Sequence, residues 1–300
     1  MTPVVGQVME QAQWRARESA HHERVDAATA DHLERRHEGR KHPVNDFLWT
    51  YYSHRPAQLR RWHPGAGVGL RGAQGRADWK FYRYAGGLAC VDVPAFLAAR
   101  GDTVRFVRDL LAATASRPAH LGCFGLHEWA MVYRLTPEQV RHADWPLRLG
   151  ASGTDEVVEA HQVRCSHFDA FRFFTPPARP LNALAPTRDT QPVLEQPGCL
   201  HANMDLYKWA YKLTPVVPSD LVADCFDLAR EVRALDMRAA PYDLSDLGFE
   251  PVRIETTEGK QEYVAAQREF AARAQGLRRR LVDVCDAVLA EPGQSDVSST

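Results

Sequence analysis

The sequence has no apolar run of the ~20 residues that a membrane-spanning helix needs. Its first residues do not join a basic start to an apolar block, so we expect no secretory signal. It also has no Cys-x-x-Cys pair, because its six cysteines are scattered along the chain. Scattered cysteines in apolar or mixed surroundings are typical of reduced, buried thiols. We therefore expect a cytoplasmic protein without a membrane partner.

Lysine is scarce, since only 5 of the 37 basic residues are lysines and 32 are arginines. The net charge of −1 hides an asymmetry between the two halves of the chain. Residues 1–150 hold 21 basic and 15 acidic residues, a balance of +6, whereas residues 151–300 hold 16 and 23, a balance of −7. Residues 35–83 alone hold 11 basic and 3 acidic residues, which makes this the most basic region of the chain.

The same region contains an aromatic-rich stretch, HPVNDFLWTYYSHRPAQLRRWHPG, at residues 42–65. Rings that stack on bases and cations that contact phosphates are what a nucleic-acid surface needs. We predict that this surface includes Tyr51, Tyr52, Arg55, Arg60, Arg61 and Trp62. The alternative is a solvated face on which the arginine stems cover apolar side chains.

Periodicity predicts a mainly helical α+β fold, with a single domain over residues 1–291, a few short antiparallel strands and a disordered tail at 292–300. We expect helices at 7–40, 94–113 (broken around Gly101), 121–133, 200–210, 218–235 and 261–290, and a further turn at 137–142. We expect strands at 79–84 and 88–93, joined by a tight turn at Gly86-Gly87, and further strands at 161–174 and 252–256. Residues 236–243 are predicted to form a polar turn.

Histidines beside carboxylates suggest a metal site. On a strand at 161–174, the side chains of His167 and Asp169 would point the same way. His-x-Asp is half of the ligand set that leaves iron open positions, and His201 or His127 could complete it. The predicted cofactor is then iron, manganese or zinc. The alternative is that these imidazoles only form hydrogen bonds inside a mixed core.

Acid–base chemistry without a metal is a second possibility. Cleavage of a base–sugar bond needs a carboxylate and aromatic walls around the base. The favoured carboxylates are Asp46, Glu128 and Asp205, and further candidates are Asp169, Asp236 and Asp243. In this reading no cofactor is required.

Three segments, the stretch at 42–65, LHANMDLYKWAYKL at 200–213 and LDMRAAPYDL at 235–244, resemble a bacterial family commonly labelled 3-methyladenine DNA glycosylase. The resemblance extends from Trp14 to about Leu281. It implies hydrolysis of the base–sugar bond of an alkylated purine, with DNA as partner, and it assigns no catalytic residue. The leading expectation is thus a base-excision enzyme. The alternatives are a metal-dependent oxidoreductase, of the mononuclear or dinuclear non-haem iron type, and a non-catalytic nucleic-acid-binding protein.

Overall fold

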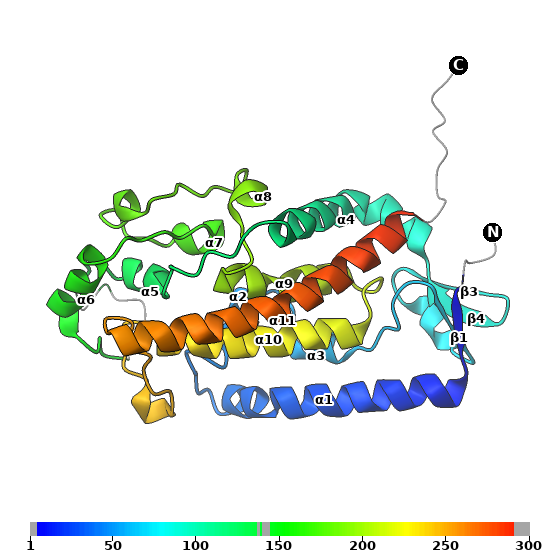
Figure 1. The fold of residues 1–300 in the computed structure, drawn as a ribbon. Coiled ribbons are helices and arrows are strands. Elements are labelled where there is room, and N and C mark those ends of the chain that lie inside the picture. Colours follow the sequence, from blue (N-terminus) through cyan, green and yellow to red (C-terminus); the bar gives the residue numbers. More distant parts are fainter. Residues whose placement is uncertain (1–4, 137–138, 140–144, 291–300) are drawn as a thin grey trace, which may run out of the picture.

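Four helices, α4 (Val93–Ala115), α9 (Leu200–Lys212), α10 (Ser219–Arg238) and α11 (Thr257–Leu289), form the centre of the computed structural model, which describes residues 5–136, 139 and 145–290 (Figure 1). Helix α9 packs against α10 and α11, and α11 also packs against α4. One large apolar cluster joins these four helices. The expectation of a mainly helical α+β fold is confirmed.

Helix α9 is unusual because eleven of its residues are buried, polar ones included. His201, Asn203 and Asp205 are therefore inside the protein rather than on a solvent face. A helix that is buried all round needs partners for each polar side chain. Polar side chains of the neighbouring elements therefore gather around α9.

A small sheet lies at one end of the molecule, and α5 (Leu126–Ala130), α6 (Gly150–Glu159) and α7 (Phe168–Phe171) lie at the other (Figure 1). The strand order is β1 (Gln7–Met9), β2 (Val68–Arg71), β4 (Leu88–Val91), β3 (Tyr82–Ala85). The β3–β4 hairpin confirms the predicted turn, in which Gly86 and Gly87 both have positive φ. Strand β1 pairs parallel to β2, so the sheet is mixed rather than purely antiparallel.

The long helix α1 (Gln11–His37) lies along one side of the molecule (Figure 1). Two short helices, α2 (Phe47–Tyr51) and α3 (Pro56–Arg60), follow it in the aromatic-rich stretch. The remaining described elements are short: η1 (Gln74–Asp78), η3 (Arg179–Leu181), α8 (Gln191–Leu194) and η4 (Ser245–Leu247).

Several predicted boundaries are wrong. Residues 7–9 form a strand, α4 continues through Gly101, and the helix predicted at 121–133 is limited to α5. Residues 161–174 and 252–256 form no strand; the former contain α7, and Asp236 belongs to the last turn of α10 rather than to a polar turn. The turn predicted at 137–142 falls mostly outside the described residues, and the predicted tail at 292–300 lies wholly outside them.

Candidate metal centre

Two groups of three buried side chains converge near the start of α9. One consists of His127, His201 and Asp236, and the other of His167, Glu195 and Asp205. Within each group, one potential ligand atom per residue lies within 4.8 Å of the others. We call them the first and the second triad. Imidazole nitrogens and carboxylate oxygens are ligands for iron, manganese and zinc.

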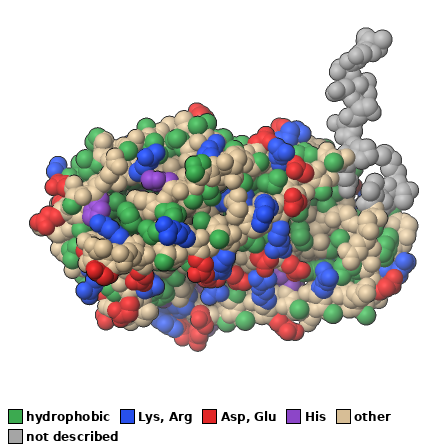
Figure 2. Space-filling model, in the orientation of Figure 1, with side chains coloured by type: hydrophobic (Ala, Val, Ile, Leu, Met, Phe, Trp, Pro, Cys, Tyr) green, Lys and Arg blue, Asp and Glu red, His purple; other side chains and the backbone are tan. Residues whose placement is uncertain are grey.

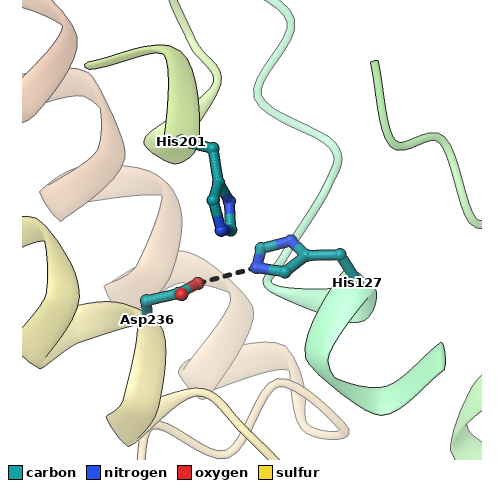
Figure 3. Close-up of side chains that lie close together, drawn as sticks. All are labelled: His127, His201 and Asp236. Atoms are coloured by element: carbon teal, nitrogen blue, oxygen red, sulfur yellow. Dashed lines mark hydrogen bonds and ion pairs between the residues drawn. The ribbon is translucent and has the colours of Figure 1, made fainter. Parts of the chain in front are cut away.

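The first triad joins three helices (Figure 3). His127 comes from α5, His201 from the first turn of α9, and Asp236 from the last turn of α10. His127 Nε2 lies 2.9 Å from Asp236 Oδ1, and the centroids of the His127 and His201 rings are 4.6 Å apart. Residues separated by 109 positions in the chain thus meet in one buried group.

Protons and charge are distributed unequally within the first triad. Burial favours the neutral form of His127, but the Asp236 carboxylate outweighs it and raises the pKa of His127 well above its ordinary value. Burial, aided by the positive charge on His127, lowers the pKa of His201 well below its ordinary value. His201 is therefore neutral, and its ring forms no hydrogen bond within the described part of the chain. A neutral imidazole with a free lone pair is the form that binds a metal.

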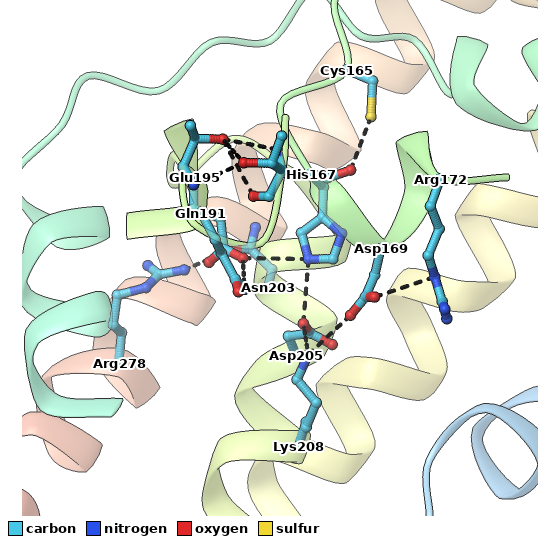
Figure 4. A network of polar contacts seen from close by, with 12 residues as sticks. Cys165, His167, Asp169, Arg172, Gln191, Glu195, Asn203, Asp205, Lys208 and Arg278 are labelled. Carbon is cyan, nitrogen blue, oxygen red and sulfur yellow. Dashed lines mark hydrogen bonds and ion pairs between the residues drawn. The ribbon is translucent and has the colours of Figure 1, made fainter. Parts of the chain in front are cut away.

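The second triad lies between α9 and the segment that ends at α8 (Figure 4). His167 Nε2 lies 3.2 Å from Asp205 Oδ2 and 3.4 Å from Glu195 Oε1. The other ring nitrogen, His167 Nδ1, is buried without a hydrogen-bond partner. Asp205 also accepts from the Tyr52 hydroxyl at 2.8 Å and is ion-paired with Lys208.

The pKa values of the two carboxyl groups of the second triad are shifted in opposite directions. Burial raises the pKa of Glu195. Burial would raise the pKa of Asp205 as well, but the Lys208 ammonium and the contact with His167 hold it below its ordinary value. Asp205 therefore favours the ionised form more strongly than Glu195 does. Environments that push the pKa values of neighbouring groups apart are typical of functional sites.

The triads adjoin through their histidines. The rings of His167 and His201 are stacked with centroids 5.3 Å apart. Glu128 adjoins the first triad, because it shares Arg233 with Asp236. The joint cluster therefore contains four carboxyl groups, those of Glu128, Glu195, Asp205 and Asp236. Arg233 contacts Glu128 and Asp236, and Lys208 contacts Asp205. Glu195 lies 3.4 Å from His167 and in the field of the buried Arg278. Each buried carboxyl group thus has a cationic or titratable neighbour, as buried charges require.

The structure brings three of the four predicted metal ligands together, namely His127, His167 and His201. The fourth, Asp169, is not among them, because residues 168–171 form helix α7 instead of a strand. Side chains two apart diverge on a helix. The carboxylate of Asp169 lies 3.3 Å from Arg172 and 3.5 Å from Lys208 instead.

The three favoured carboxylates are placed in different surroundings. Only Asp205 lies in a triad. Glu128 is buried beside the first triad, where it accepts from Arg233 at 2.9 Å. Asp46 lies elsewhere, between His32 and Arg35 of α1, each of which it contacts at 2.8 Å. The structure thus connects Asp46 to the end of α1, not to the buried cluster.

The six predicted nucleic-acid contacts do not form one exposed surface. Tyr52 and Trp62 are buried, and Tyr51 is half-buried and stacked on Phe47. Arg55, Arg60 and Arg61 are exposed, but Arg60 pairs with Asp26 and Arg61 lies over the ring of Trp79. Acidic and basic side chains are interspersed on the face shown in Figure 2. The bases would therefore find few of these rings open for stacking.

Sequence reasoning missed Glu195 as a ligand and assigned Asp236 to a polar turn. Glu195 stands in a proline-rich segment that has no periodicity, so no pattern could have indicated it. The sequence did contain one pattern that indicates the polar face of α9. His201, Asp205 and Lys208 follow one another at i, i+4 and i+7, which places three charged or titratable side chains on one helical face.

We found no family model, curated protein or solved structure that matches this chain. Among the described residues, no helix combines the length and apolar character needed to cross a bilayer.

Proposed function

We propose that this chain is a metal-dependent oxidoreductase of the non-haem iron type. The observation that carries the proposal is the first triad: two imidazoles and one carboxylate, from three different helices, converge within 4.8 Å. Two histidines and one carboxylate on one side of an iron ion leave open positions for oxygen and substrate. The second triad adjoins the first and offers a place for a second ion.

The surroundings of the first triad suit a bound cation. The described residues leave the His201 ring without a hydrogen bond, so a metal would not have to displace a partner there. Arg233 Nη1 donates to Asp236 Oδ2 at 3.2 Å and so fixes the orientation of the carboxylate. Such outer contacts orient ligands in metal sites. All six cysteines are unpaired thiols, in keeping with the reducing cytoplasm as the proposed location.

This chain's own residues would position and shield the reacting groups. Asp236 and His201 would hold the ion, while His127 would exchange its proton for it. Lys208 and Tyr52, which both contact Asp205, lie on the side of the second triad where a cavity opens. The bound ion would supply the oxygen chemistry, and the protein would orient the reacting groups and move protons.

Metal content tests the proposal. The protein is expressed with added iron, purified without oxygen and analysed by mass spectrometry. We expect one or two first-row ions per chain in the wild type and, in His201→Ala, the loss of the ion held by the first triad. His37→Ala, at an exposed position at the end of α1, is the matched control and should keep its metal. Circular dichroism checks that each variant is folded.

Asp205→Asn separates the two triads, because it removes a ligand of the second triad only. A partial loss of metal in this variant would mean that both triads are occupied. Equal metal in the wild type and in His201→Ala would overturn the proposal. Release of a free alkylated base from damaged DNA by metal-free protein would favour base excision instead.

A further inference from the structure

A cavity of about 210 Å³ lies beside the second triad. It has a basic lining, because Arg172, Lys208 and Lys212 face it together with a single carboxylate, that of Asp169. Its formal charge is therefore three positive and one negative, a balance of +2. Cavities lined by one sign of charge concentrate ligands of the opposite sign.

The cations of this cavity are not equally paired. Lys208 contacts Asp205 and Asp169, and Arg172 contacts Asp169. Within the described residues, Lys212 forms no ion pair; its ammonium lies over the Trp209 ring, 5.5 Å from the centroid. Burial and the charge of Lys208 lower the pKa of Lys212. A bound anion would relieve this repulsion between two neighbouring ammonium groups.

Aromatic rings supply the rest of the wall. Tyr51, Tyr52 and Tyr211 line the cavity, with the Tyr51 and Tyr52 centroids 4.8 Å apart and those of Tyr52 and Tyr211 6.3 Å apart. Aromatic walls favour flat ligands that pack face to edge or offset against them. At ~30 Å³ per water molecule, the volume corresponds to roughly seven waters. A ligand of the size of a single substituted ring fits this space.

The cavity is connected to the candidate metal centre. Tyr52 donates to Asp205 Oδ1, and Lys208 is paired with Asp205 Oδ2, so two residues of the wall hold one ligand of the second triad. Asp205 in turn contacts His167, whose ring is stacked on His201. A molecule held in the cavity would therefore lie against Tyr52 and Lys208, which both contact a ligand of the second triad.

We propose that this cavity is the substrate pocket of the enzyme and that it binds a small aromatic carboxylate. The carboxylate group pairs with Lys212 and Arg172, and the ring packs against the tyrosines. That the bound molecule is a substrate rests on the proposed function. That it binds rests on the cavity alone, so binding can be measured in the absence of metal.

The test uses metal-free full-length protein, prepared with a chelator, and titration calorimetry at low ionic strength. Benzoate is the probe, and benzamide, which has the same shape without the charge, is the matched ligand. We expect benzoate to bind, and benzamide to bind about tenfold more weakly, since a charge-assisted contact is lost. Lys212→Gln should weaken benzoate binding by a similar factor. Lys260→Gln, at the start of α11 and outside the cavity, should leave it unchanged.

Arg172→Gln provides a second variant on the other side of the pocket. Equal binding of benzoate and benzamide, an unchanged affinity in both pocket variants, or no benzoate binding by the wild type would each overturn the assignment. These outcomes are independent of metal content. If benzoate binds but protein from iron-supplemented cells contains no metal, the pocket is supported and the oxidoreductase proposal is refuted. If the protein contains metal but benzoate does not bind, the oxidoreductase proposal is supported and the pocket is refuted.

Discussion

Arg233 is a buried cation that holds two carboxylates beside the first triad. Its guanidinium contacts Glu128 and Asp236, and its side chain is only 2% exposed. It also lies over the ring of Phe47, 3.8 Å from the centroid. Removing one partner of a buried ion pair leaves an uncompensated charge, which is far more costly than loss of an exposed pair. The residue therefore links the stability of the fold to the geometry of the candidate centre.

We predict that Arg233→Met lowers the free energy of unfolding by about 3–5 kcal/mol. Arg273→Met is the control, because Arg273 pairs with Glu231 near the surface and its loss should cost about 1 kcal/mol or less. Urea denaturation followed by circular dichroism gives both values. Similar losses in the two variants would show that the buried pairing does not stabilise the protein.

His54 is a buried imidazole that remains neutral. Its Nδ1 lies 2.9 Å from the Tyr207 hydroxyl, and its ring stacks on Tyr211 at 4.6 Å. Burial lowers the pKa of His54 to about 4. When the pH falls below 6.5, the ordinary pKa of histidine, His54 of the unfolded chain takes up a proton. In the folded protein His54 takes up this proton only when the pH falls to about 4. Folding is therefore disfavoured progressively as the pH falls through this window.

We expect the free energy of unfolding to fall between pH 6.5 and 4 by up to about 1.4 kcal/mol per pH unit through His54 alone. His54→Gln should remove this part of the slope, so the curves of the wild type and the variant should converge as the pH falls. Denaturant titrations at half-unit steps of pH measure the difference. Parallel curves would contradict a neutral, buried His54.

Among the elements, the long helices were the easiest to predict. Their apolar positions recur with helical spacing over many residues, so α9, α10 and most of α11 were recognised. The break predicted at Gly101 was wrong because one glycine costs a helix only ~1 kcal/mol, and the packing of α4 against α11 outweighs it. The strand predicted at 161–174 was wrong because polar and apolar residues alternate there without any partner strand within the described residues.

Helix α11 offers a matched pair of glycines for testing how its start is fixed. Thr256 caps the helix by accepting from the backbone N–H of Gly259 at 3.0 Å. A Cβ at Gly259 would lie 2.0 Å from the carbonyl oxygen of Arg253, whereas a Cβ at Gly276 would have no neighbour within 4 Å. The clash at Gly259 is with backbone, which cannot move aside as a flexible side chain would.

We predict that Gly259→Ala destabilises the protein, by at least about 1–3 kcal/mol, because the start of α11 must shift. Gly276→Ala should instead stabilise it by up to about 1 kcal/mol, through the higher helix propensity of alanine. Thermal unfolding of both variants gives the comparison. The same sign of change in both would mean that local propensity, not the close approach, decides the outcome.

At the scale of the whole molecule, the candidate centre depends on contacts that sequence patterns do not specify. His127 and Asp236 are 109 positions apart, and His167 and Asp205 are 38 apart. Three of the histidines were recognised by their residue type and their neighbouring carboxylates. Their assembly was not predictable, because it requires the packing of α5, α9 and α10 and the course of residues 165–195. Asp236 was among the candidate carboxylates, but its place beside His127 and His201 could be recognised only once α10 was known to continue to Arg238.

The candidate centre couples metal binding to folding, since its ligands meet only in the folded chain. A ligand that binds the folded state alone stabilises it by about 2.7 kcal/mol at a concentration 100 times its dissociation constant. We predict that Mn(II), which does not require exclusion of oxygen to the extent that iron does, raises the free energy of unfolding of metal-free wild type. The increase should be absent in His201→Ala, which lacks the neutral imidazole of the first triad.

The effect of Mn(II) should grow with pH. In metal-free protein Asp236 raises the pKa of His127, so the His127–Asp236 pair contributes stability that is fully present below the ordinary histidine pKa and is lost as the pH rises through the raised one. The metal must displace this proton, and the displacement becomes easier over the same window. Unfolding curves with and without Mn(II) should therefore diverge in the wild type as the pH rises above ~6.5. A Mn(II) effect that is independent of pH, or equally large in His201→Ala, would place the bound ion away from the first triad.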